Sequence, residues 1–162
     1  MKTKLVILFL FFACHIYAQT NDNGQIDSFK QQYLSELKTL GKKFSNDFYP
    51  NYHTFYTLSE KIFLYKMDSA RRDFNTVLNK YKKKLDDKYF QEQEAEIKYY
   101  FDKLLIEYPI NYEIAQVSYS AAKSRIPEML KKNLADFNKP ELLTNTDFIN
   151  YVRAFFSLQY DN

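Results

Sequence analysis

From residue 26 onward, apolar side chains recur at steps of three and four residues, and few residues interrupt them. The chain has only two glycines, Gly24 and Gly41, and four prolines. Steps of three and four place apolar residues on one face of a helix, which can then pack against other helices. The clearest stripe is Ile26, Phe29, Tyr33, Leu37, Leu40, Phe44 and Phe48. The pattern predicts an all-α fold, an irregular bundle of about six or seven helices.

Prolines and short polar residues set the expected boundaries of these helices. A proline ends a helix or stands in its first turn, whereas Asp and Thr cap a helix start. Helices are expected to end at Pro50 and Pro109. The expected N-caps are Asp68, then Asp86 or Asp87, and Thr146. Pro127 is expected to open a short helix that buries Leu130, Leu134 and Phe137. A separate helix with Ile110, Ile114, Val117 and Ala121 is expected after Pro109. The apolar run at residues 62–65 fits either a helix or a short strand.

Residues 1–18 have the features of a secretory signal peptide. Two lysines precede an apolar run at residues 5–13, which is shorter than the ~20 residues that span a bilayer. Cleavage is expected after Ala18. In the alternative, the sequence ending at Cys14 is similar to a lipobox, and Cys14 would be lipidated. We therefore expect a periplasmic or extracellular protein, held at a membrane only if Cys14 carries lipid, with a flexible leader at 19–25 and one helical domain at 26–162.

The composition of the chain after residue 18 argues against most covalent and metal-dependent chemistry. Cys14 is the only cysteine, Trp is absent, and His53 is the only histidine outside the leader. Nucleophiles, metal sites and redox pairs draw mainly on those residue types, so we expect no catalytic residue, no metal and no cofactor. Loss of Lys2 and Lys4 would leave a net charge near +1 instead of +3, which gives no basis for a nucleic-acid partner.

Two charged clusters each have a structural and a functional interpretation. The run from Lys80 to Lys84 contains four lysines, which suit either the phosphates of nucleic acid or lipid, or a solvated helix C-terminus. A group of carboxylates (Glu92, Glu94, Glu96, Asp102 and Glu107) suits either acid–base catalysis or a solvent face with ion pairs at helical spacing. We favour the structural interpretation for both clusters, and for Asp68-Ser69-Ala70, where Ser69 would otherwise be an O-glycosylation site.

Aromatic residues make up 19% of the chain, with 15 Tyr and 15 Phe. The rings favour a core and half-buried rim over a stacking platform, because stacking sites usually accompany a basic groove. The last helix is apolar on two sides near the end of the chain. We therefore expect an interaction surface there, formed by Tyr151, Phe155, Phe156 and Tyr160.

The run from Phe55 to Tyr160 resembles the helical region that precedes the thioredoxin-like domain in TlpA-like periplasmic thiol-disulfide proteins. The similar stretches are Ile126-Pro127-Glu128, Pro140-Glu141-Leu142-Leu143 and the segment from Phe148 to Phe155. In that family a Cys-x-x-Cys pair in the thioredoxin-like domain performs the redox chemistry. This chain has no such pair, so the resemblance carries over no active-site residue.

Together these patterns favour an exported, non-enzymatic interaction or accessory module of the bacterial cell envelope, whose partner is another envelope protein or domain. The resemblance implies that this partner is a thioredoxin-like domain. In an alternative hypothesis, the chain is itself the helical accessory domain of a TlpA-like oxidoreductase and lacks the catalytic domain. A third hypothesis is a helical protein that binds a small ligand on its tyrosines.

Overall fold

A computed structural model describes residues 28–115 and 124–160, in which every regular element is a helix and no strand occurs. This result confirms the predicted all-α irregular bundle. The elements in chain order are α2 (Ser28–Phe48), α3 (Tyr52–Tyr56), α4 (Glu60–Lys80), α5 (Asp87–Ala115), α6 (Ile126–Leu130), the 3-10 helices η2 (Lys131–Asn138) and η3 (Pro140–Thr144), and α7 (Thr146–Tyr160).

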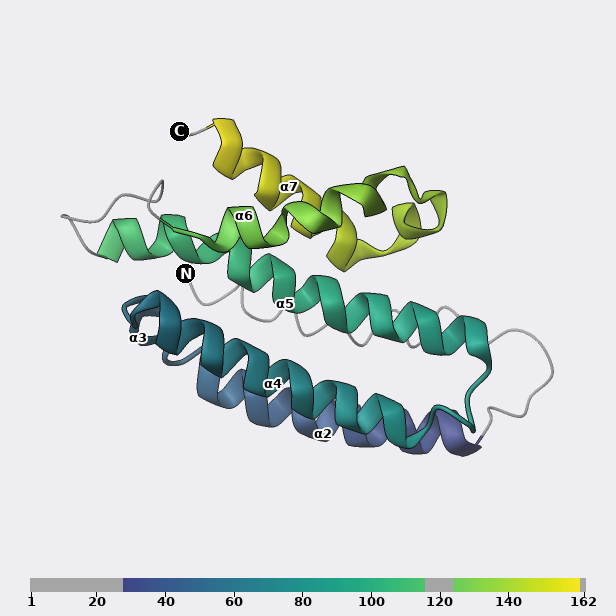
Figure 1. The fold of residues 1–162 in the computed structure, drawn as a ribbon. Coiled ribbons are helices and arrows are strands. Elements are labelled where there is room, and N and C mark those ends of the chain that lie inside the picture. The colour runs from purple at the N-terminus through teal and green to yellow at the C-terminus, as the bar shows by residue number, and fades with distance from the viewer. Residues whose placement is uncertain (1–27, 116–123, 161–162) are drawn as a thin grey trace.

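The long helix α5 is the middle of three layers. It contacts α3 and α4 on one side and α6 and α7 on the other, while α2 pairs with α4 (Figure 1). Figure 1 also shows that α2 begins at the end of the bundle where α4 turns into α5. The arrangement gives α5 two buried faces, which explains why apolar residues surround most of its circumference.

Six tyrosines with almost fully buried side chains form much of the core, and each hydroxyl donates a hydrogen bond. Burial of a hydroxyl without a hydrogen-bond partner costs free energy, so a tyrosine in the core requires an acceptor for its hydroxyl. Three of the acceptors are backbone carbonyls, of Leu58, Leu104 and Leu130. The tyrosines are Tyr33, Tyr56, Tyr81, Tyr99, Tyr108 and Tyr151. For these residues, the prediction of a structural role is confirmed.

The helix α4 is longer than expected. Asp68 does not cap a new helix but lies exposed inside α4, and residues 62–65 are helical too. The apolar residues Phe63, Met67 and Phe74 stay in helical register across this position and are all buried. No Gly or Pro interrupts the segment, so one aspartate is not enough to end the helix.

The helix α5 also continues where an end was expected, because Pro109 lies inside it and the helix reaches Ala115. Proline removes one backbone hydrogen bond, but tertiary packing compensates here. The Tyr108 ring stacks on Phe63 at 4.5 Å between centroids and on Tyr112 at 5.2 Å. Ile110 and Ile114 therefore belong to α5, whereas Val117 and Ala121 lie outside the described residues.

Side-chain caps identify the starts of two helices. The Tyr89 backbone amide donates to Asp86 Oδ1 at 2.8 Å, so Asp86 rather than Asp87 caps α5. For α7 the cap is Asn145 rather than Thr146, because the Phe148 amide donates to Asn145 Oδ1 at 2.8 Å. Pro127 stands in the first turn of α6, one residue after its start, and α6 ends at Leu130, so Leu134 and Phe137 lie in η2 and not, as predicted, in the same helix.

Candidate functional site

The structure corrects the interaction surface that the sequence indicated on α7. Tyr151 and Phe155 point into the core, with exposed fractions of 0% and 4%, and the Tyr151 ring lies 5.6 Å from Tyr99 of α5. Phe156 is 43% exposed. Tyr160 belongs to α7, but its side chain is outside the described part. Tyr151 therefore packs α7 against α5, and Phe155 packs it against Phe137 of η2, at 6.3 Å between ring centroids.

Phe156 instead belongs to a small apolar patch shared by α7 and η2. Its ring lies 5.7 Å from the ring of Phe137, which is half-buried. Leu134 precedes Phe137 by three residues in a 3-10 helix, so the two side chains project to the same side. Leu134 was expected to be buried, yet it is 40% exposed. We call Leu134, Phe137 and Phe156 the η2/α7 patch.

A buried polar network fixes η2 against α4 and α5. Asp102 of α5 accepts a hydrogen bond from Arg71 Nη2 at 2.6 Å and from Asn133 Nδ2 at 2.9 Å. Asp102 and Asn133 are 2% and 1% exposed, so both depend on these partners. Asp102 is 31 positions from Arg71 and 31 positions from Asn133 in the sequence. Local sequence patterns carry no signal for such contacts, and Asp102 was wrongly expected on a solvent face.

A second cluster lies one turn further along η2. Asp136 accepts from Lys98 Nζ at 2.6 Å, from Lys139 Nζ at 2.7 Å and from the hydroxyl of Tyr99. Burial alone would raise the pKa of Asp136, but the hydrogen bonds from Lys139, Lys98 and Tyr99 bring it well below its ordinary value. The carboxylate therefore stays charged and holds η2 against α5.

The other carboxylates of α5 divide between the surface and the interior. Glu107 pairs with Lys103 at 3.2 Å and at the expected helical spacing, but both side chains are half-buried, whereas Glu94 is exposed. Glu96 is half-buried and accepts a hydrogen bond from Gln93 Nε2 at 2.8 Å. Burial, with the negative charges of Asp147 and Glu92, raises the pKa of Glu96 to about 7 despite the hydrogen bond from Gln93.

The remaining sequence candidates are scattered over the molecule. His53 is exposed on α3, and Ser69 is half-buried in the middle of α4. Modification of Ser69 remains a prediction, and Cys14 lies outside the described residues. Lys82, Lys83 and Lys84 are exposed in the turn between α4 and α5. Of these groups, His53, Ser69 and the three lysines are described by the structure, and none of them contacts a carboxylate of α5.

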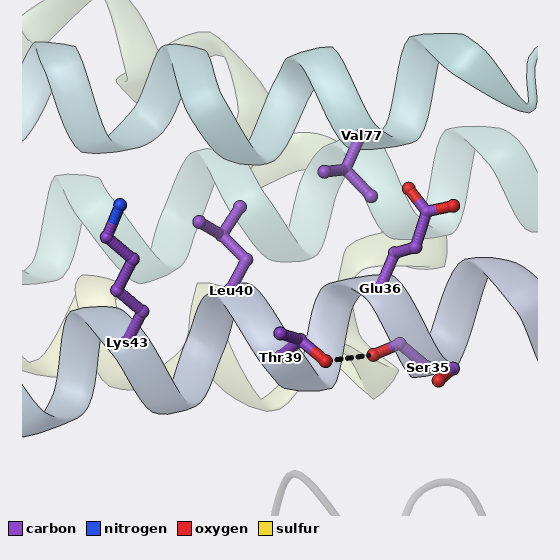
Figure 2. A pocket seen from close by; sticks show the side chains of 6 residues that line it. All are labelled: Ser35, Glu36, Thr39, Leu40, Lys43 and Val77. Atoms are coloured by element: carbon purple, nitrogen blue, oxygen red, sulfur yellow. Dashed lines mark hydrogen bonds between the residues drawn. The ribbon is translucent and has the colours of Figure 1, made fainter.

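An open groove of about 360 Å³ runs between α2 and α4. Figure 2 shows Leu40 and Val77 between the two helices, with the charged ends of Lys43 and Glu36 on either side. Ser35 and Thr39 complete the lining, and no tyrosine takes part. Glu36 is already engaged by Lys80 Nζ and the Tyr81 hydroxyl, each at 2.6 Å.

Within residues 28–115 and 124–160, no group of three or more His, Cys, Asp or Glu side chains is arranged to hold a metal ion. In the same part of the chain, no helix combines the length and apolar character needed to cross a bilayer. In comparisons with known proteins, no family model, curated protein or solved structure matches this chain.

Proposed function

We propose that this chain is an exported, non-enzymatic interaction module of the bacterial cell envelope, and that it contacts another envelope protein through the η2/α7 patch. The observation that carries the proposal is the position of Phe156. Its ring is 43% exposed and leans on Phe137, beside Leu134, which is 40% exposed. Exposed aromatic side chains at the centre of an apolar patch are typical anchors of protein interfaces.

The base of the patch is braced, which favours binding. Phe137 contacts the rings of Phe148, Tyr151 and Phe155, and Asp136 beside it is held by two lysines. A surface whose side chains are already fixed loses less conformational entropy when a partner binds. The small size of the patch favours a limited contact, such as that of an accessory module with a neighbouring domain.

The resemblance to TlpA-like proteins supports a thioredoxin-like domain as the partner class. The proposal does not extend to a ligand stacked on tyrosines, because six tyrosines are core residues with bonded hydroxyls, and the α2/α4 groove has none in its lining. The proposal includes export of the chain, with either cleavage after Ala18 or lipidation of Cys14. The intact mass of the mature protein distinguishes these two forms.

Photo-crosslinking in cells that produce the full chain tests the proposed contact. A photoreactive phenylalanine analogue replaces Phe156 in one variant and Tyr65 in the control, since Tyr65 is 69% exposed on α4, away from η2 and α7. We expect one discrete adduct with a different envelope protein from position 156 and none from position 65. Equal adducts from both positions, no adduct from position 156, or an adduct of two copies of this chain would overturn the proposal.

A further inference from the structure

The turn between α4 and α5 presents three consecutive lysines, Lys82, Lys83 and Lys84, all exposed. The ion pairs of this region use other lysines: Lys80 binds Glu36 at 2.6 Å, and Lys88 lies 4.0 Å from Glu92. None of the three turn lysines forms an ion pair with a carboxylate of the described residues. Their ammonium groups are therefore available to an external anion.

Aromatic rings lie beneath the ammonium groups of two of these lysines, Lys82 and Lys84. Lys84 Nζ lies 4.8 Å from the centroid of Phe29 and 5.6 Å from that of Tyr81, while Lys82 Nζ lies 5.5 Å from that of Phe90. Such cation–π distances favour ammonium positions close to the protein surface. Phe29 is itself 39% exposed. The end of the bundle thus combines free positive charge with an exposed aromatic ring.

The acidic residues nearby do not cancel this charge. Glu36 is held by Lys80 and Tyr81, and Asp86 accepts from the Tyr89 amide at 2.8 Å. The exposed Asp87 remains, but it stands in the first turn of α5, where the positive end of the helix dipole offsets its charge. Residues 80–88 hold five lysines against two aspartates, so the turn keeps a local excess of positive charge.

We propose that this turn, with Phe29 beside it, docks on an anionic lipid surface by contact between the three lysines and lipid phosphate groups. The shape favours a flat partner, because the turn is the protruding end of two helices and not a groove that could follow a nucleic-acid strand. Phe29 is placed to enter the interfacial region where aromatic side chains partition. Figure 1 shows that α2, the helix that contains Phe29, begins at this same end.

Binding of the purified mature chain to lipid vesicles tests the proposal. The assay contains no other protein, so its result does not depend on the η2/α7 patch. Vesicles of phosphatidylcholine with about one-third phosphatidylglycerol are compared with pure phosphatidylcholine at low and high salt. We expect binding to the anionic vesicles alone, weakened by salt. Lys83→Gln should weaken it about fivefold, the effect of roughly one lysine at a charged membrane surface. The triple variant of Lys82, Lys83 and Lys84 to Gln should abolish it.

The matched control replaces Lys38, Lys42 and Lys43 of α2 by Gln. These three lysines are also exposed and give the same change in net charge. We expect the control to bind within about twofold of the original chain, because it leaves the turn intact. Equal losses in both triple variants would overturn the proposal, as would absence of binding to anionic vesicles. Tighter binding to duplex DNA than to the vesicles, or competition by millimolar inorganic phosphate, would overturn it too.

Discussion

Arg71 of α4 donates a hydrogen bond to Asp102 of α5 at 2.6 Å, and this ion pair is a charged link between two layers of the bundle. The Asp102 side chain is 3% exposed and that of Arg71 is 24% exposed, so the pair is largely shielded from water. Asn133 of η2 shares the same carboxylate. One buried side chain therefore positions both α4 and the base of the η2/α7 patch.

Replacement of Asp102 by Leu should lower the free energy of unfolding by about 3 kcal/mol, because it leaves Arg71 and Asn133 without their acceptor. Combining Asp102→Leu with Arg71→Met should recover much of that loss, since no uncompensated charge remains. Glu128→Gln serves as the control, because it breaks the exposed pair with Lys131 and should cost less than about 1 kcal/mol. Urea unfolding measures the free energy of unfolding of the original chain and of the three variants. A double variant no more stable than Asp102→Leu alone would contradict this account.

Glu96 should make stability fall as the pH rises towards neutrality. The folded chain raises the pKa of Glu96 from 4.5 to about 7, so between these values the folded state holds a proton that the unfolded state has lost. The ionised Glu96 therefore lowers the free energy of unfolding by its full amount above pH 7, and it has no such effect below pH 4.5.

Glu96→Gln keeps an acceptor for Gln93 and removes the charge. The variant should match the original at pH 4 and exceed it at pH 8 by about 3 kcal/mol in the free energy of unfolding, at ~1.4 kcal/mol for each pKa unit. The exposed Glu94 provides the control, since Glu94→Gln removes the same charge at the surface and should change the free energy of unfolding by less than about 0.5 kcal/mol. A Glu96→Gln gain that is the same at pH 4 and pH 8 would refute the assignment.

The two aspartates before α5 should differ in their effect on stability. Asp86→Ala removes the side-chain acceptor of the Tyr89 amide and should cost about 1 kcal/mol. Asp87→Ala removes only a favourable charge in the first turn, at a cost of a few tenths of a kcal/mol. Denaturant midpoints of the two variants compare them directly, and equal losses would show that Asp86 is not the cap.

The neighbouring residues Phe155 and Phe156 should separate stability from binding. Phe155→Ala opens a cavity in the core and should cost about 3–5 kcal/mol. Phe156→Ser changes an exposed ring and should cost less than about 1 kcal/mol while it removes the proposed contact. Thermal unfolding and the crosslinking assay together test the pair. A Phe156→Ser variant as unstable as Phe155→Ala would place Phe156 in the core.

The sequence predicted the fold class because its apolar spacing reports directly on helix faces. It failed where one residue was taken as a boundary: Asp68 and Pro109 both lie inside longer helices that are stabilised by contacts with distant rings. It also failed on α7, where hydropathy identified Phe155 and Phe156 equally. The difference between them depends on whether η2 and α5 cover that face, and periodicity within α7 carries no information on its neighbours.

The middle position of α5 has a consequence for how this domain can come apart. Its 29 residues form a rod about 43 Å long that is covered on two sides. Backbone amides around Phe101 are therefore released only when both outer layers separate, so their hydrogen exchange should report the global unfolding equilibrium. Within residues 28–115 and 124–160, either outer layer can leave only by exposing the apolar face of α5 that it covers.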